Sequence, residues 1–155
     1  MKRVRYVDGA VDALDTAILA ALAQDARTPM RELAQKIGLS APSTTERVRR
    51  LETAGVIEGY TVRVNPAAIG LPLAAILRIR PMPGELSRVA EILAAIPELT
   101  ACDRVTGDDC FIAKAQVPSV ADLETLINGL LPYASTNSCV VVSTLVPQRL
   151  PSSSA

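Results

Sequence analysis

Hydrophobic residues in the first part of the chain recur every three or four positions, which is the spacing of one face of a helix. The pattern predicts a helix over residues 11 to 24, with one face formed by Val11, Leu14, Ile18 and Leu22. Asp8 or Asp12 is placed to accept hydrogen bonds from the free amides at the start of this helix. The stretch DARTP then interrupts the pattern, which predicts the end of the helix.

Two further helices are predicted, separated by a short turn. Thr28 and Pro29 are suited to begin the second helix, and Gly38 is suited to end it. Ser40 is placed to cap the third helix, whose inner face would carry Thr44, Val48 and Leu51 before Gly55 ends it. So short a turn between two helices predicts a helix-turn-helix, with the third helix as its reading helix.

The segment that follows predicts a wing. VIEGYTVRV, residues 56 to 64, alternates between apolar and polar positions well enough for a short strand or β-ribbon. A ribbon at this place would make the N-terminal domain a winged helix-turn-helix. NPAAIGLP, residues 65 to 72, contains two prolines and a glycine and predicts a hinge.

Beyond the hinge the pattern changes from helical to alternating. Strands are expected at residues 73–81, 99–105, 109–117 and 137–146, and helices at 84–98 and 119–131. The inner faces of the helices would carry Leu86, Val89, Leu93 and Ile96 in the first, and Val120, Leu123, Ile127 and Leu130 in the second. This order is β-α-β twice, which predicts a ferredoxin-like βαββαβ domain with a four-stranded antiparallel sheet and an α+β chain overall.

The predicted domains are residues 1–64, the hinge 65–72, the sheet domain 73–150 and a tail 151–155. Two helices can cover only one face of the sheet. That covered face would carry Leu77, Ile79, Phe111, Ala113, Ala115 and Val117, and the open face Ile76, Arg78, Arg80, Cys110, Ile112, Lys114 and Gln116. A face that mixes apolar and charged groups is typical of a surface that pairs with a copy of itself, so we expect a homodimer through this domain.

Composition narrows the possible functions. The chain has no histidine, which excludes Cys-His and Ser-His catalysis and zinc sites that need imidazole. Cys102, Cys110 and Cys139 show no CxxC spacing, which favours a reducing compartment over a disulfide framework, and their apolar surroundings predict that they are buried. No apolar run is long enough to cross a membrane, and the N-terminal residues lack the pattern of a secretory signal. A cytoplasmic protein without a cofactor or metal is expected.

Charge is balanced overall but uneven locally. The chain carries 16 basic and 16 acidic residues. Between residues 27 and 50, however, basic residues outnumber acidic ones. The basic residues are Arg27, Arg31, Lys36, Arg47, Arg49 and Arg50, and the acidic residues are Glu32 and Glu46. A local basic patch of this kind is typical of a surface that binds the phosphates of double-stranded DNA.

Within the patch, the three arginines of the third helix are the foremost candidates for DNA contact. The alternative is a solvated face on which Glu46 and Glu52 are their partners. Ser43, Thr45 and Glu46 lie off the inner face and could reach base edges, whereas which of Arg47, Arg49 and Arg50 reads a base stays open. Arg27, Thr28, Lys36 and Ser40 are predicted phosphate contacts, since helix N-termini and their caps present donors to anions.

The order of these parts resembles the Lrp/AsnC family of leucine-responsive and asparagine-synthesis regulators over nearly the full chain. LDTAILAALAQDART is similar to the family's first helix and turn, and ELAQKIGLSAPSTTERVRRLETAGVIEGYTVRVNPAAIG to its helix-turn-helix, wing and hinge. CDRVTGDDCFIAKAQV resembles the ligand-loop region of its C-terminal domain. The resemblance implies a sequence-specific transcriptional regulator that is not an enzyme, and a dimer that often assembles to octamers.

The resemblance also implies an amino acid or related small effector bound between dimers. In this chain the loop that would meet it is VTGDD, with help from the approach to the last strand. The implied effector residues are Val105, Thr106, Gly107, Asp108, Asp109, Thr136, Asn137 and Ser138. Asp108 or Asp109 could pair with the effector's ammonium group. Where many members have an aspartate three residues after the loop glycine, this chain has Cys110.

Two other functions remain open at this point. One is an architectural DNA-binding protein that works by self-association without a small effector. The other is a small enzyme on the ferredoxin-like domain, in which Cys110 with Asp108 and Asp109 would have to act without a histidine. For the VTGDD loop itself, the plain alternative is a turn between adjacent strands, because Gly-Asp is common in turns.

Overall fold

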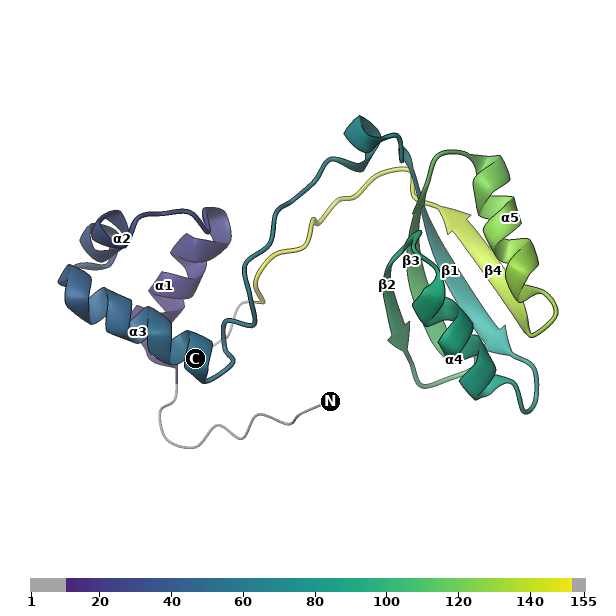
Figure 1. Cartoon of the computed structure of the whole chain (residues 1–155), viewed down its shortest axis with the longest axis horizontal. Helices are drawn as coiled ribbons and strands as arrows, with labels where there is room; N and C mark the ends of the chain where they lie inside the picture. The colour runs from purple at the N-terminus through teal and green to yellow at the C-terminus, as the bar shows by residue number, and fades with distance from the viewer. Residues whose placement is uncertain (1–10, 152–155) are drawn as a thin grey trace. The chain divides into compact units, whose positions relative to one another are not determined.

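The computed structural model describes residues 11–151, which divide into two compact units (Figure 1). The second unit is Arg63–Leu145, and the described residues of the first are 11–62 together with 146–151. The predicted alternative cap Asp8 and residues 152–155 of the predicted tail lie outside the described residues. No helix among residues 11–151 is long and apolar enough to cross a membrane.

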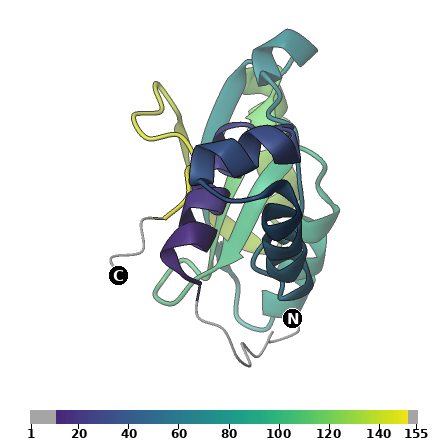
Figure 2. The same cartoon turned by 90° about the vertical axis from the view of Figure 1, so that its left-hand side faces the viewer.

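The first unit is built from three helices, α1 (Ala13–Gln24), α2 (Met30–Ile37) and α3 (Ala41–Thr53), which face the viewer in Figure 2. Their apolar faces meet in one core. Its buried members are Ile18, Leu22, Leu33, Val48 and Leu51. The predicted inner faces of the first and third helices are confirmed at Ile18, Leu22, Thr44, Val48 and Leu51. Leu14 is only half-buried and lies outside this core, and Val11 precedes α1 and is 38% exposed.

Side chains at the helix ends explain where each helix begins and stops. The Asp12 carboxylate accepts from the Asp15 amide at 2.8 Å, and the Asp15 carboxylate accepts from the Asp12 amide at 3.3 Å, so that each satisfies an otherwise free donor. Ser40 caps α3 as predicted, and Gly38 ends α2 with a φ of +72°. The predicted cap at Thr28 is wrong, because the N-cap of α2 is Pro29 and makes no side-chain hydrogen bond.

The predicted wing is absent from the described part of the chain. Residues 56 to 64 contain no strand, and the one sheet described lies in the second unit. A strand needs a neighbour to satisfy its backbone groups, and alternation along a segment does not supply one. Tyr60, Val62 and Val64 are accordingly exposed rather than packed. A short 3-10 turn, Pro66–Ile69, lies within the predicted hinge.

The second unit has the predicted ferredoxin-like arrangement. Its elements are β1 (Leu73–Pro81), α4 (Leu86–Ala95), β2 (Leu99–Arg104), β3 (Phe111–Val117), α5 (Val120–Leu130) and β4 (Ala134–Val140). The strands form an antiparallel sheet in the order β2-β3-β1-β4, with Leu77 opposite both Ala113 and Ser138. Figure 1 shows α4 and α5 on the same side of this sheet.

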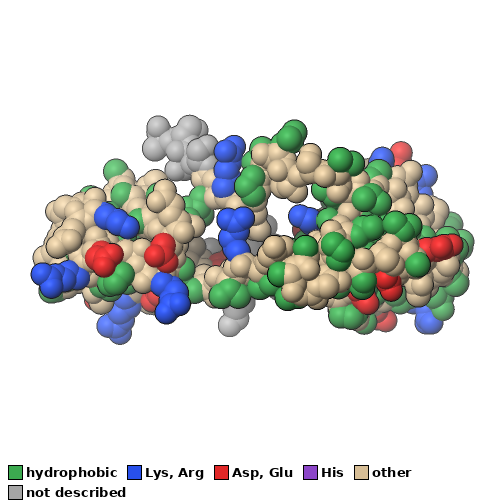
Figure 3. Space-filling model, turned by 90° about the horizontal axis from the view of Figure 1, so that it is seen from above, with side chains coloured by type: hydrophobic (Ala, Val, Ile, Leu, Met, Phe, Trp, Pro, Cys, Tyr) green, Lys and Arg blue, Asp and Glu red, His purple; other side chains and the backbone are tan. Residues whose placement is uncertain are grey.

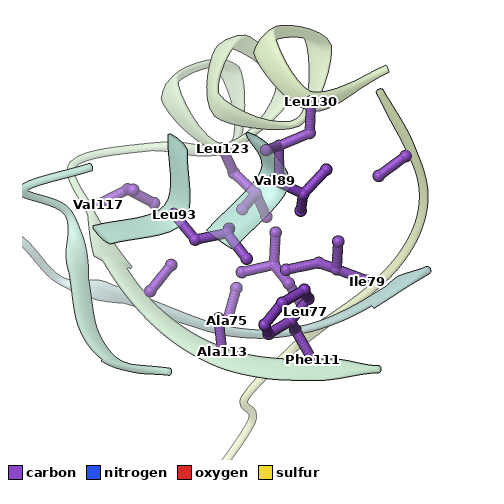
Figure 4. Close-up of a cluster of buried hydrophobic side chains, with 12 residues drawn as sticks. Ala75, Leu77, Ile79, Val89, Leu93, Phe111, Ala113, Val117, Leu123 and Leu130 are labelled. Carbon is purple, nitrogen blue, oxygen red and sulfur yellow. The ribbon is translucent and has the colours of Figure 1, made fainter. Parts of the chain in front are cut away.

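The core of the second unit lies between the sheet and these two helices (Figure 4). Side chains from alternate strand positions, such as Leu77, Ile79 and Phe111, point toward Val89 of α4 and Leu130 of α5. Each buried side chain of this size stabilises the fold by about 1.5–3 kcal/mol relative to leaving it exposed. The predicted covered face is confirmed, and the open face leaves Ile76 41% and Ile112 39% exposed.

Three details of this unit differ from the prediction. The last strand begins at Ala134, opposite Pro81 at the end of β1, rather than at residue 137, and it ends at Val140, opposite Ala75. The run VVVSTLV therefore mostly lies beyond the sheet. Val120 is 63% exposed instead of facing the core. Cys102 and Cys139 are exposed and Cys110 is half-buried, so the expected burial of the cysteines is wrong for the first two.

Candidate nucleic-acid interface

Helix α3 presents one buried face and one exposed face. Thr44, Val48 and Leu51 point into the core, and the Thr44 hydroxyl donates to the Ser40 carbonyl at 3.0 Å. Its exposed positions include Ser43, Thr45, Glu46, Arg49 and Arg50. Hydroxyl, carboxylate and guanidinium groups on one accessible helix face are the groups that read base edges in a major groove.

Two of the three arginines of α3 are held by carboxylates at the start of α1, the N-cap Asp12 and Asp15 of the first turn. Arg47 Nη1 lies 2.7 Å from Asp12 Oδ2 and 2.8 Å from Asp15 Oδ1. Arg50 Nη2 forms an ion pair with the second oxygen of Asp15. The Asp15 side chain is fully buried, whereas the side chains of Arg47 and Arg50 are 25% and 50% exposed. The contact ties the start of α1 to the middle of α3.

The ionisation of this cluster follows from its hydrogen bonds. The Asp15 amide and then the Arg47 guanidinium hold the pKa of the Asp12 carboxyl below its usual value. Asp12 and then Asp15 raise the pKa of Arg47. Every buried side-chain nitrogen or oxygen among residues 11–151 has a hydrogen-bond partner, so the Asp15 carboxylate is satisfied within the fold.

DNA contact by Arg47 and Arg50 therefore stays a prediction, although one guanidinium nitrogen of each is already paired within the fold. The alternative partners are wrong for these two arginines, because they pair with Asp12 and Asp15 rather than with Glu46 or Glu52. Arg49 is exposed and pairs with no described carboxylate. The pairing with Asp15 could not be predicted from local sequence, because Asp15 lies 32 and 35 positions from the two arginines.

The predicted phosphate contacts divide in the same way. Arg27, Lys36 and Ser40 are exposed, and the Ser40 hydroxyl keeps its proton for a donor bond because its oxygen accepts from the Ser43 amide. Thr28 is only 5% exposed and its hydroxyl donates to the Asp25 carbonyl at 2.8 Å. Thr28 is therefore a buried structural residue rather than a phosphate contact. Figure 3 shows basic and acidic side chains side by side on the visible face of the first unit.

Glu52 has a different partner just after α3. The Tyr60 hydroxyl donates to Glu52 Oε1 at 2.7 Å, which anchors the segment that leaves the helix. Partial burial and the Glu52 carboxylate raise the pKa of Tyr60 to about 12. Both effects disfavour the phenolate, so Tyr60 remains a hydrogen-bond donor at neutral pH.

A second candidate site is a pocket of about 220 Å³ at the sheet of the second unit. All of its lining residues are polar or charged: Arg78, Arg80, Asp109, Ser135, Thr136 and Asn137. Strand β1 supplies the arginines, β4 supplies the three small polar residues, and the loop between β2 and β3 supplies the carboxylate. The arrangement can bind a small ligand that carries both a carboxylate and a hydrogen-bonding group.

Ion pairs organise this pocket. Arg78 Nη2 lies 2.6 Å from Asp109 Oδ2, and Arg78 Nε donates to the same oxygen at 2.7 Å. Arg80 Nε donates to the Asp108 carbonyl at 2.7 Å, while its Nη2 lies 3.7 Å from the Asp108 carboxylate. Both arginine side chains are 55% exposed, so each keeps donors that face solvent.

Only part of the expected effector set lines the pocket. Asp109, Thr136 and Asn137 do, whereas the expected residues that do not are Val105, Thr106, Gly107, Asp108 and Ser138. Ser138 lies opposite Leu77, one position beyond the pocket residue Asn137 on β4. The loop is also a turn between paired strands, with Val105 donating to the Cys110 carbonyl at 2.8 Å and a φ of +105° at Gly107.

Sequence reasoning missed Arg78, Arg80 and Ser135 as pocket residues. The alternation of residues 73–81 had already placed both arginines on the open face, but it did not show that the β2–β3 loop reaches them. No group of three or more Cys, Asp or Glu among residues 11–151 is arranged to hold a metal ion.

Two family models match the chain. Residues 11–52 match the AsnC-type helix-turn-helix domain, and residues 74–151 match the Lrp/AsnC ligand binding domain. The chain is 37% identical over 133 residues to the transcriptional regulator LrpC of Bacillus subtilis, covering 86% of this chain and 92% of that protein. It is 34% identical over 143 residues to LrpA of Mycobacterium tuberculosis, covering 90% and 95%.

Solved structures of similar proteins superpose on nearly the whole chain. The structure of B. subtilis LrpC superposes with a TM-score of 0.86 at 35% identity, covering 90% of this chain and all of that one. A feast or famine regulatory protein from M. tuberculosis, solved in complex with L-methionine, superposes with a TM-score of 0.84 at 33% identity, covering 92% and 99%. The curated relatives are named as regulators of transcription, not as enzymes.

Proposed function

Because the chain belongs to the Lrp/AsnC family of DNA-binding transcriptional regulators, we propose that α3 is its reading helix and that the exposed face of α3 selects the operator. The observation that carries this proposal is the position of α3, second in a helix-turn-helix, with Ser43, Thr45, Glu46 and Arg49 accessible. These four side chains supply donors and acceptors for base edges. Arg27, Lys36 and Ser40 contact phosphates and set the register of the helix.

The protein acts as a homodimer through the open face of its sheet. Ile76 on β1 and Ile112 on β3 are exposed there among charged groups, and a second copy would remove them from water. A dimer would present two α3 helices to successive major grooves, about 34 Å apart if the half-sites lie one turn apart. Assembly of dimers to octamers and a cytoplasmic location are parts of the same proposal.

The pocket at Arg78 binds a small effector, an amino acid or a related compound. Support comes from its charges, since Arg78 and Arg80 can bind a carboxylate and Asp109 can accept from an ammonium group. The M. tuberculosis relative crystallised with L-methionine supports an amino-acid effector. An effector that favours one assembly over another would shift DNA occupancy by the difference of its affinities for the two.

Selection of genomic DNA by the purified protein tests this proposal, with and without a panel of amino acids. The native chain should recover a shared palindrome, and Arg49→Ala should lose or change it. Arg104→Ala, which removes one exposed arginine from the second unit, is the control and should recover the native sequence. An unchanged palindrome with Arg49→Ala would contradict the reading role of α3.

The same selection distinguishes a regulator from an architectural protein. Occupancy of the palindrome that responds to one amino acid supports the regulator, and calorimetry should then show that Asp109→Asn weakens binding of that amino acid. DNA binding without sequence preference or response would support an architectural role instead.

A further inference from the structure

The Asp15 carboxylate of α1 is the most deeply buried charge in the first unit, and it faces the reading helix. Its side chain is fully buried, and its two oxygens are bound by Arg47 at 2.8 Å and by Arg50. One of them also accepts from the Asp12 amide at 3.3 Å. Asp12, at the edge of the cluster, is the second partner of Arg47 at 2.7 Å.

Stability alone is a weak reason for such a cluster. Removing a carboxylate from water is costly, and buried ion pairs are often matched or exceeded in stability by apolar residues of the same volume. An apolar side chain can be buried close to this position, since Ile18 lies one turn along α1 from Asp15 and is fully buried. The cluster therefore calls for an explanation that includes its charge.

The ion pairs with Asp15 affect how the arginines of α3 can contribute to DNA binding. Arginines on a reading helix lie near the DNA backbone, and phosphate contacts add affinity for every sequence alike. Arg47 and Arg50 keep their charge but direct donors to α1, whereas Arg49 is bound to no described carboxylate. One guanidinium nitrogen of Arg47 and one of Arg50 are thus engaged by these carboxylates and not available to phosphate.

We propose that Asp15 is a specificity-determining positioning residue: by holding Arg47 and Arg50 against α1, it limits sequence-independent binding, so that the exposed side chains of α3 decide which duplex is bound. The proposal rests on the proposed reading role of α3. It concerns the ratio of specific to non-specific affinity, which decides whether one operator is found among many competing sites.

The size of the effect follows from counterion release. Each arginine that newly contacts a phosphate makes the logarithm of the affinity fall more steeply with the logarithm of salt, by about 0.9. Releasing both arginines would steepen the slope by about 1.8 at most. Between 200 mM and 50 mM salt, this corresponds to a gain of about ten-fold in affinity for any duplex.

The test measures the affinity of the full chain for its selected operator and for a scrambled duplex over a range of salt concentrations. Asp15→Asn keeps the shape of the side chain and removes its charge. It should bind the scrambled duplex more tightly at low salt, with a slope steeper by about 1 to 2, and the operator-to-scrambled ratio should fall. If both affinities fall together with an unchanged slope, Asp15 is only structural and the inference is wrong.

A second variant decides the question if Asp15→Asn does not fold. Arg47→Gln keeps Arg50 on Asp15, and because Arg47 does not contact phosphate in this account, its salt slope should equal that of the native chain. A slope shallower by about 0.9 would show that Arg47 already binds phosphate and would overturn the inference. If the native chain binds no duplex, the proposed function itself fails, and that result is distinct from either outcome.

Discussion

The two units of the chain use the same pair of residue types, arginine and aspartate, in opposite ways. In the first unit Asp15 is fully buried beneath Arg47 and Arg50. In the second, Arg78 and Asp109 pair on the surface with side chains 55% and 23% exposed, and the buried cluster beneath the sheet is formed by hydrophobic side chains. Both units have an apolar core, but among the described residues only in the first is a buried carboxylate added that ties one helix to another.

Because of this difference, substitutions at the three places should affect stability and binding to different extents. Truncation in the apolar cluster should mainly affect folding of the second unit. Changes at the buried carboxylate should affect both the stability of the first unit and its DNA binding. Changes at the surface pair should mainly affect ligand binding, since exposed ion pairs contribute little to stability.

Leu77→Ala should lower the free energy of unfolding of the second unit by about 2–5 kcal/mol, because it leaves a cavity at a fully buried position. Native-state hydrogen exchange of β1 and β3 amides measures this loss, and α3 amides report whether the first unit is spared. Val142→Ala, at a position 97% exposed, is the control and should change little. Equal losses in both units would contradict their separate cores.

Asp15→Ala should lower the free energy of unfolding of the first unit by about 1–3 kcal/mol, since it removes hydrogen bonds to two charged partners that remain partly exposed. Exchange of α1 and α3 amides measures the loss. A change too small to measure would show that the buried carboxylate does not hold α3 in place.

Asp109→Asn should lower the free energy of unfolding of the second unit by less than about 1 kcal/mol, because the ion pair with Arg78 lies at the surface. The same variant should weaken binding of an amino-acid effector, which calorimetry measures directly. Ser138→Ala, one position beyond the pocket residue Asn137, is the matched control. Loss of effector binding in both variants would place the effector outside this pocket.

The smallest expected effect is a change in the pKa of Tyr60. The pKa of Tyr60 is raised to about 12 by partial burial and by Glu52, so Glu52→Gln should lower it toward 10, without restoring it fully. A raised folded pKa stabilises the neutral phenol, so this contribution is complete below pH 10 and is lost as the pH rises through about 12. Ultraviolet absorbance of the phenolate measures the shift, and Glu58→Gln, which alters a neighbouring carboxylate, should leave it unchanged.

Much of this fold could be predicted because periodicity records which side chains are buried. The inner faces of α1 and α3 and the covered face of the sheet follow from residues such as Ile18, Val48 and Leu77. The wing at residues 56 to 64 could not be judged in this way, because alternation shows a face but not a partner strand. The polar β4 was placed too late for the same reason, since pairing with β1 sets its limits.

The candidate site was harder to predict than the fold. Composition marked the arginines of α3 as one group, but the fold separates Arg49 from Arg47 and Arg50 through Asp15, a residue from a distant helix. The pocket shows the same limit, since Arg78 meets Asp109 across 31 positions of sequence. Long-range pairs of charges leave no local pattern in one sequence, so they appear only once the chain is folded.

Nuclear magnetic resonance of the arginine side chains, recorded with and without the selected operator, distinguishes the held arginines of α3 from the reading one. We expect the guanidinium signals of Arg47 and Arg50 to keep the positions that they have without DNA, while the signal of Arg49 moves. If the signals of Arg47 or Arg50 move with DNA as the Arg49 signal does, or if only theirs move, the division of α3 into held and reading arginines is contradicted.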